Sequence, residues 1–142
     1  MKKKALISAC LIGVNCKYSG GNNLLPAEKL KKLMDEYELI PVCPECFGGL
    51  PVPRMPSERV GDRVLSKDGK DVTAEYEKGA EAALLIAGML GADTAFLKEN
   101  SPSCGCGTIY DGTFSGTLTD GDGVTAEKLK QNGIIIYGES KI

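Results

Sequence analysis

The chain has 142 residues, which suits a single domain over residues 1–142 with one hydrophobic core. Hydrophobic residues make up 42% of it, but no apolar run reaches the roughly 18 residues of a membrane span. The net charge is −2 and no basic cluster follows the lysines at 2–4. This balance argues against nucleic acid as a partner and favours a small molecule.

The start of the chain resembles an export signal only superficially. Five residues separate Lys4 from Cys10, whereas a signal peptide needs an apolar region of about 7–15 residues. We therefore expect a cytoplasmic protein, where reducing conditions disfavour disulfides among the six cysteines. The chain has no histidine, so proton transfer falls to other side chains.

Short apolar runs predict the strands of a parallel sheet. Residues 5–9, 39–42 and 95–97 are compact and mostly apolar, as buried strands are. Between the first two, residues 26–37 repeat apolar side chains at helical spacing, with Pro26 in the first turn. A strand, a helix and a strand in this order predict parallel pairing.

The middle of the chain begins with a dense group of prolines and glycines. Residues 43–58 are expected to form a long, stiff loop without a helix. Residues 59–70 predict a small hairpin. Thr73 is the expected N-cap of a buried helix that ends at Gly91.

The last third of the chain predicts a second long loop over residues 98–123. A short helix at 125–131 and a strand at 134–137 follow it. The predicted fold class is therefore α/β: a single-domain, three-layer αβα architecture with a Rossmann-like, mostly parallel sheet. Its long Gly/Pro-rich loops would lie at the C-terminal edge of the sheet.

Three cysteines far apart in the sequence follow the predicted core strands. They are Cys10, Cys43 and Cys104. Parallel strands end at one edge of a sheet, so the three thiols are expected to converge there. Three thiolates at one point indicate a metal or an iron–sulfur cluster with one position left for a substrate. Small buried core residues are the alternative interpretation.

Two local cysteine pairs offer a different metal site. Cys43 with Cys46, and Cys104 with Cys106, could form a tetrahedral zinc site with four thiolates. The distance between the pairs exceeds the spacing of zinc ribbons, and this site would leave Cys10 unexplained. The first pair is also a possible redox motif.

Polar residues near these cysteines are candidates for catalysis. Glu45 is a possible general acid/base, with a solvated loop carboxylate as the alternative. Ser101 and Ser103 precede Cys104 and are candidates to orient water or a substrate, or ordinary turn residues.

Three further residues are candidates for contact with a substrate. Lys98 could neutralise a thiolate-rich site or pair with Glu45, and Arg54 could hold a carbonyl or an anion. Tyr18 could stack on a planar ring. A solvated lysine, an arginine that rigidifies its loop and a tyrosine that packs a loop are the alternatives.

Three blocks of the sequence, together spanning almost the whole chain, resemble the thiouracil desulfidase (desulfurase) family. They are SACLIG at 8–13 with YSGG at 18–21, PVCPE at 41–45 running into GGLPVPR at 48–54, and KENSPSCG at 98–105.

The resemblance implies a 4Fe-4S cluster with three-cysteine ligation and one open iron. The ligands would be Cys10, Cys43 and Cys104, the acid/base carboxylate Glu45 and the functional serine Ser101. The implied reaction removes sulfur from a thiolated pyrimidine base or nucleoside, such as 2-thiouracil, giving the oxo base and sulfide without net electron transfer.

Two rival functions stay open at this stage. One is a non-catalytic zinc- or iron–sulfur-binding module, and zinc is also a possible adventitious substitute for the cluster. The other is a thiol-redox protein that uses Cys43 and Cys46. The resemblance leaves Cys16, Cys46 and Cys106 outside the ligand set.

Overall fold

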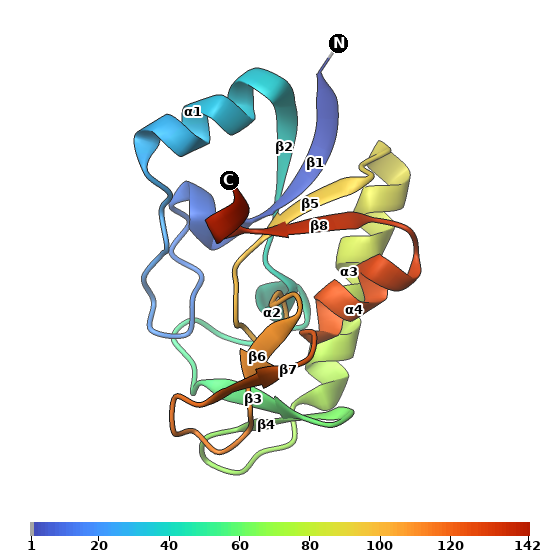
Figure 1. Ribbon diagram of the computed structural model, residues 1–142. Coiled ribbons are helices and arrows are strands. Elements are labelled where there is room, and N and C mark those ends of the chain that lie inside the picture. Colours follow the sequence, from blue (N-terminus) through green and yellow to red (C-terminus); the bar gives the residue numbers. More distant parts are fainter. Residues whose placement is uncertain (1) are drawn as a thin grey trace.

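A parallel sheet of four strands lies at the centre of the computed structural model, which describes residues 2–142 (Figure 1). The strand order is β2-β1-β5-β8, and every neighbouring pair is parallel. The strands are β1 (Lys3–Ser8), β2 (Tyr37–Val42), β5 (Thr94–Leu97) and β8 (Ile135–Gly138). The predicted parallel α/β sheet is confirmed.

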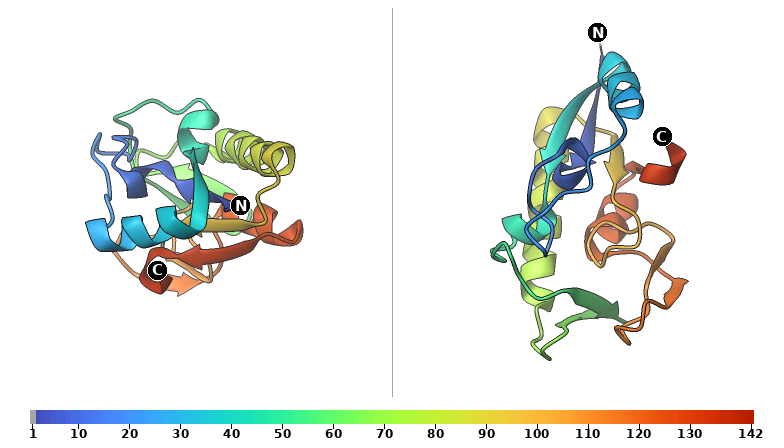
Figure 2. Two further views of the ribbon diagram at one scale, coloured as in Figure 1. Left: turned by 90° about the horizontal axis from the view of Figure 1, so that it is seen from above. Right: turned by 90° about the vertical axis from the view of Figure 1, so that its left-hand side faces the viewer.

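Helices pack on both faces of this sheet, as the views of Figure 2 show. Successive side chains of a strand point to opposite faces. Accordingly Ile7 of β1 packs on the side of α1, while its neighbour Leu6 packs with α3 and α4. The helices are α1 (Ala27–Glu36), α3 (Thr73–Leu90) and α4 (Val124–Gln131). The result is the predicted three-layer αβα arrangement.

The order of the strands places a switch point at β1. The chain runs from β1 to β2 on one side, and later to β5 on the other side. In open α/β sheets, ligands bind at the carboxyl ends of the strands next to such a point. The loops that follow Ser8, Val42 and Leu97 therefore start at the edge of the sheet where a site is expected.

The predicted helix over residues 26–37 ends earlier than expected. Helix α1 stops at Glu36, and Tyr37 has extended backbone and opens β2. The Tyr37 ring meets Phe96 edge to face, with a centroid distance of 5.1 Å. This tertiary contact favours a strand at Tyr37, although Tyr37 follows Leu33 at helical spacing.

The proline-rich segment was predicted to lack a helix, and this prediction is wrong. It contains the single turn α2 (Pro44–Phe47). Pro44 occupies the first turn, where its missing N–H has no helical partner to lose. The following strands β3 (Ser57–Val60) and β4 (Arg63–Ser66) form the predicted hairpin.

The segment 98–123 was predicted as a loop but contains a second hairpin. Its strands are β6 (Thr108–Tyr110) and β7 (Leu118–Asp120), and they pair antiparallel. All of β7 is exposed, so its sequence carries no hydrophobic alternation. Two 3₁₀ helices complete the fold: η1 (Ala9–Ile12) after β1 and η2 (Glu139–Lys141) after β8.

The ends of α3 match the sequence closely. Thr73 is its first residue rather than its N-cap, which is Val72. The Thr73 hydroxyl instead accepts a hydrogen bond from the Val64 amide at 2.9 Å. Gly91 ends the helix in the left-handed conformation, as predicted. Among residues 2–142, no helix has both the length and the apolar character needed to cross a membrane.

Candidate active site

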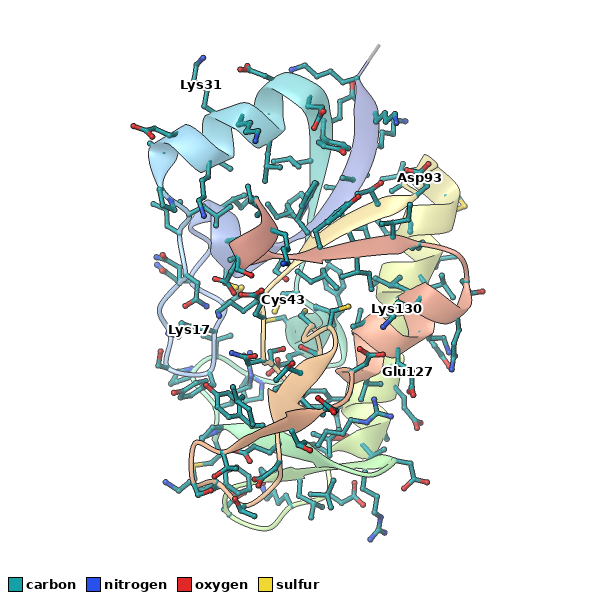
Figure 3. The ribbon with its side chains drawn as sticks, in the orientation of Figure 1. Lys17, Lys31, Cys43, Asp93, Glu127 and Lys130 are labelled. Carbon is teal, nitrogen blue, oxygen red and sulfur yellow. The ribbon has the colours of Figure 1, made fainter. Side chains whose placement is uncertain are left out.

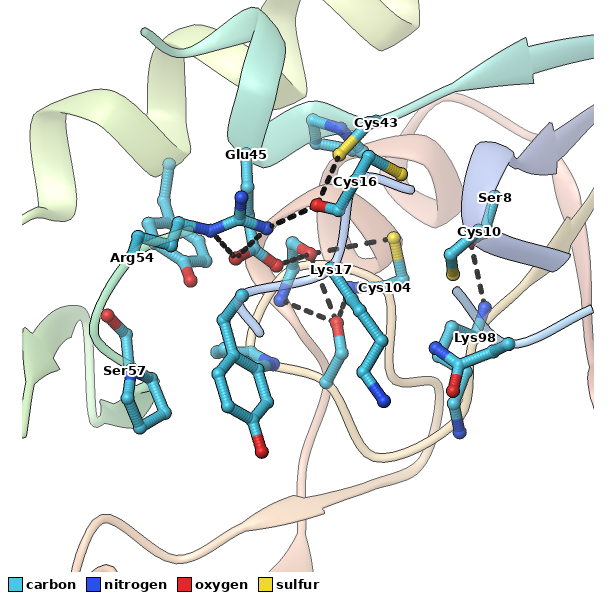
Figure 4. Close-up of a pocket in the computed structure, with 18 of the residues that line it drawn as sticks. Ser8, Cys10, Cys16, Lys17, Cys43, Glu45, Arg54, Ser57, Lys98 and Cys104 are labelled. Atoms are coloured by element: carbon cyan, nitrogen blue, oxygen red, sulfur yellow. Dashed lines mark hydrogen bonds and ion pairs between the residues drawn. The ribbon is translucent and has the colours of Figure 1, made fainter. Parts of the chain in front are cut away.

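A cavity of about 480 Å³ opens at the carboxyl edge of the sheet (Figure 4). The structure brings to its walls all the site residues predicted from the sequence: Cys10, Tyr18, Cys43, Glu45, Arg54, Lys98, Ser101, Ser103 and Cys104. Cys43 is partly buried near the middle of the view in Figure 3, whereas Lys31 and Asp93 are exposed.

The three predicted cysteine ligands reach this cavity from three different strands. Cys10 lies in η1 directly after β1, and Cys43 is the N-cap of α2 directly after β2. Cys104 lies in the loop after β5. Burial raises the pKa of Cys104 to about 12. Burial also raises the pKa of Cys10, despite the opposing hydrogen bond with Asn23. Thiolates in such surroundings need positive charge, which a metal centre provides.

A fourth thiol, Cys16, also lines the cavity, although the resemblance left it outside the ligand set. Its pKa is raised to about 12, first by burial and then by the charge of neighbouring Cys43. The thiols of Cys43 and Cys46 both approach the Cys16 carbonyl oxygen, at 3.9 and 4.0 Å. No sequence signal had separated Cys16 from an ordinary loop residue.

The second cysteines of the two pairs in the zinc alternative pack against different hydrophobic clusters. Cys46 packs against the core on the α1 side, and Cys106 against the core of α3 and α4. Within residues 2–142, no group of three or more cysteines or carboxylates is arranged around a point that would suit one metal ion. A cubane cluster differs from one ion, because each of its thiolates binds a separate iron.

Glu45 projects from α2 with both carboxylate oxygens in hydrogen bonds. The Nε and Nη2 atoms of Arg54 each lie 3.1 Å from Oε1. The Ser103 hydroxyl donates to Oε2 at 2.9 Å. The Arg54 and Glu45 side chains are only 7% and 17% exposed. Charged groups paired at this depth are held more firmly than a surface salt bridge.

Two glycines set the position of α2 against α3. A Cβ atom on Gly79 would lie 1.8 Å from the Pro44 carbonyl oxygen, and one on Gly48 would lie 1.9 Å from the Glu75 carbonyl oxygen. Neither position has room for any side chain. The two backbones thus touch directly, and this contact fixes the turn that carries Cys43 and Glu45.

The loop before Cys104 is held by its own serines. The Ser101 hydroxyl accepts hydrogen bonds from the Cys104 amide at 2.8 Å and the Ser103 amide at 3.2 Å. It also lies 3.0 Å from the Ser103 hydroxyl. Through Ser103, a continuous hydrogen-bonded chain runs from Ser101 to Glu45. Gly123 packs against this loop, since a Cβ there would lie 2.4 Å from the Ser103 carbonyl carbon.

Lys98 does not pair with Glu45, which corrects one of its predicted roles. Its ammonium group donates to Glu139 of η2 at 2.7 Å. The same Glu139 oxygen accepts a hydrogen bond from the Glu99 amide at 2.9 Å. The C-terminal end of the chain therefore supplies the partner, and Glu45 takes Arg54 instead.

Arg54 is engaged almost entirely by the protein itself. Besides Glu45, its guanidinium donates to the carbonyl oxygens of Cys16 at 2.9 Å and Pro51 at 3.1 Å. Its own amide donates to the Tyr18 carbonyl oxygen at 2.8 Å. Burial is the largest single effect on the pKa of Arg54 and would lower it, but the nearby charges of Glu45, Cys43 and Cys46 and the hydrogen bond with Glu45 together raise it. Tyr18 is 47% exposed at the cavity.

Several cavity residues were not identified from the sequence, and Tyr76, Glu58 and Phe114 are among them. Tyr76 of α3 is buried, and its pKa is raised by burial and then by the charge of Glu45. Glu58 of β3 and Phe114 of the β6–β7 loop form another part of the wall. Tyr76 was read as one position of a buried helix face, and the other two lie in segments without a distinctive pattern.

Comparisons with known proteins identify the family of the chain. The profile of the 2-thiouracil desulfurase family matches residues 5–141. Protein YbbK of Bacillus subtilis (strain 168), described as uncharacterized, is 42% identical over 147 residues, covering 96% of each chain. The solved structure of the [4Fe-4S]-dependent thiouracil desulfidase TudS is 42% identical and superposes with a TM-score of 0.95, covering 99% of this chain and 93% of that one. The chain described here belongs to the 2-thiouracil desulfurase family.

Proposed function

We propose that the protein is a 4Fe-4S-dependent desulfidase that removes sulfur from a thiolated pyrimidine such as 2-thiouracil. The observation that carries this proposal is the lining of one cavity by Cys10, Cys43, Cys104 and Glu45, each cysteine following a different strand. Family membership and the likeness to TudS support it.

The residues present fit an iron–sulfur cluster. Thiolates are the usual ligands of such clusters, and the chain has no histidine that would compete. Cys10, Cys43 and Cys104 would hold the cluster. When bound, it supplies an iron with an open position, a Lewis acid that can take the thiocarbonyl sulfur.

The reaction adds water to a C=S carbon and releases sulfide, and its atoms balance without an oxidant or a reductant. A C–O bond forms, the C–S bond breaks, and the two protons of water leave with the sulfur as H₂S. In this proposal the Glu45 carboxylate accepts a proton from the attacking water and returns it to the leaving sulfur. General acid–base catalysis of this kind contributes about 10²–10⁴-fold in rate.

The neighbours of Glu45 suit this work. Arg54 holds Oε1 through two of its nitrogens, Nε and Nη2. The Ser103 hydroxyl donates a hydrogen bond to Oε2. A proton donor can therefore approach this oxygen from the side of Ser103. Ser101 continues the chain of hydroxyls from Ser103 and orients the loop of Cys104. We assign Ser101 and Ser103 together to the positioning of water and substrate.

The substrate class follows from the size and charge of the molecule. A cavity of about 480 Å³ lies within the range of roughly 300–1,000 Å³ that small ligands occupy. The net charge of −2 gives no attraction to a nucleic-acid backbone. We therefore propose a small thiolated base or nucleoside as substrate.

Anaerobic purification with iron and sulfide counts per chain, followed by assay with 2-thiouracil, tests the proposal. We expect an iron–sulfur chromophore and stoichiometric release of sulfide and uracil. Cys10→Ser should lose the cluster, whereas Cys106→Ser, outside the cavity, should keep it. Stoichiometric zinc without turnover would establish the non-catalytic module instead. Activity that needs no iron and disappears in Cys46→Ser would establish the thiol-redox protein.

A further inference from the structure

The β6–β7 loop forms a wall of the cavity to which the reaction above gives no role. Tyr110, Phe114 and Gly116 of this hairpin line the same cavity as the cysteines and Glu45. The hairpin lies beside β3 and β4 in the lower part of Figure 1, away from the central sheet. Of the three residues, Phe114 is half-buried and has a purely apolar ring.

A buried carboxylate fixes this loop from β3. One oxygen of Glu58, whose residue is 9% exposed, accepts hydrogen bonds from the Gly112 amide at 2.9 Å and the Phe114 amide at 3.1 Å. Gly112 has a φ of 95° and is pressed against β3, since a Cβ there would lie 2.4 Å from Val60 Cγ2. These two hydrogen bonds fix the position of the loop relative to β3 and the orientation of the Phe114 backbone.

Side-chain hydroxyls complete the structure of the loop. Asp111 accepts hydrogen bonds from the Thr113 amide at 3.0 Å and the Thr113 hydroxyl at 2.6 Å. The hydroxyls of Thr113, Ser115 and Thr117 follow one another at 2.6 and 2.8 Å. The Asp111 amide closes the loop on the Thr117 carbonyl at 3.0 Å. Phe114 is thus presented by an ordered loop.

The backbone of Phe114 is in the left-handed region, with a φ of 55°. Residues other than glycine avoid this region, and those held there cluster at ligand sites. The aromatic pairs within residues 2–142 involve Tyr37, Phe96 and Tyr137. Phe114 therefore has no ring partner in that part of the chain, although the residue lines a cavity.

We propose that Phe114 contacts the face of the pyrimidine ring, and that Glu58 is the positioning residue that holds it there. This inference rests on the proposed function for its substrate class. A thiopyrimidine is flat, with polar groups at its rim and an apolar π-face. Thiols, serines and Glu45 can serve the rim, and Phe114 supplies the surface for the face.

Binding of 5-fluorouracil to the iron-loaded protein, followed by ¹⁹F NMR, tests the ring contact without turnover. A stacked aromatic ring shifts the bound fluorine signal upfield. In Phe114→Leu, which keeps apolar volume but has no ring, this shift should disappear and Kd should rise by about 5- to 150-fold, the range of base–aromatic stacking. Thr119→Ala, in the exposed β7 of the same hairpin, is the matched control and should behave as the unmodified protein.

The role of Glu58 is tested by steady-state kinetics with 2-thiouracil. Glu58→Ala removes the acceptor of both amides and should raise KM with little change in kcat. Glu58→Gln keeps an acceptor oxygen and should restore KM. If Glu58→Ala yields too little folded protein, Phe114→Gly serves as the second variant. It removes the ring and relieves the left-handed backbone, and it should give the same rise in KM.

The outcomes separate this inference from the proposed function. A ring-shifted fluorine signal that depends on Phe114, in a protein that releases no sulfide, upholds the contact and refutes the desulfidase. Sulfide release with the same KM and the same fluorine shift in Phe114→Leu refutes the contact alone. Failure of the iron-loaded protein to bind 5-fluorouracil also overturns the contact.

Discussion

Gly79 of α3 and Pro44 of α2 touch through their backbones, so closely that a Cβ on Gly79 would lie 1.8 Å from the Pro44 carbonyl oxygen. Backbone cannot move aside as a flexible side chain does. The contact lies one residue from Cys43 and one from Glu45. A glycine that does not itself line the cavity therefore controls the position of two residues that do.

Gly79→Ala should push α2 away from α3 and impair both stability and activity. Overpacking of this kind costs about 1–3 kcal/mol, and a misplacement of about 1 Å in a catalytic group can cost a hundredfold in rate. Denaturant unfolding and sulfide release measure the two effects. Gly88→Ala is the matched control in the same helix, with nothing within 4 Å of the added carbon. It should stabilise the protein by about 0.5–1 kcal/mol. An unchanged Gly79→Ala protein would contradict the contact.

Glu45→Gln should lower kcat by about 10²–10⁴-fold while the iron content stays constant, because the amide cannot take the proton. The variant also leaves the Arg54 guanidinium buried beside a neutral group. Removing one partner of a buried pair costs about 3–5 kcal/mol. Single-turnover kinetics and urea unfolding separate the two losses. Glu81→Gln, exposed on α3, is the control. Full activity in Glu45→Gln would exclude Glu45 as the acid/base group.

Glu139→Ala should loosen the carboxyl edge of the sheet, because one Glu139 oxygen holds both the Lys98 ammonium and the Glu99 amide. We expect a loss of about 1–3 kcal/mol from these two unmade bonds. The freed Lys98 ammonium group should also become more accessible to solvent. The rate at which an amine-reactive reagent modifies Lys98 measures this change. Glu139→Gln keeps an acceptor oxygen and should lose less. If both variants match the unmodified protein, the η2 contact has no energetic role.

Asp71 should give the fold a dependence on pH in the acid range. Hydrogen bonds from the Thr73 hydroxyl and amide lower the pKa of Asp71 below its ordinary value of 3.8. A carboxyl whose pKa is lower in the folded chain stabilises the fold above the unfolded pKa. That contribution is lost as the pH falls through the folded pKa. Asp71→Asn should therefore flatten the acid side of the curve of unfolding free energy against pH. Asp35→Asn, on the surface of α1, should not. Identical curves for the two variants would contradict this assignment.

The sequence predicts the sheet and the positions of its cysteines well, because both depend on local patterns. Short apolar runs identify β1, β2 and β5, and a cysteine that follows such a run must lie near the carboxyl edge. The partner of Glu45 is different. Lys98 and Arg54 were both available, and the choice depends on how the loop of Arg54 folds back over the loop of Cys16. No local pattern encodes that path.

The β6–β7 hairpin shows the same limit in the backbone. Its strands are three residues long and β7 is fully exposed, so burial leaves no alternation of apolar and polar residues to detect. The hairpin is held from outside, by Glu58 through the amides of Gly112 and Phe114. Because the anchor lies in another segment, Phe114 could not be recognised as a cavity residue from the sequence.

The position of β1 at the switch point also determines the order in which the site can be assembled. β1 pairs with β2 and with β5, so Cys10 meets Cys104 only after β5 has been synthesised and docked. A chain emerging from the ribosome therefore has no complete set of thiols until most of its length is available. Any group bonded to Cys10 and Cys104 together would tie the first strand to a late loop, and its insertion would follow folding.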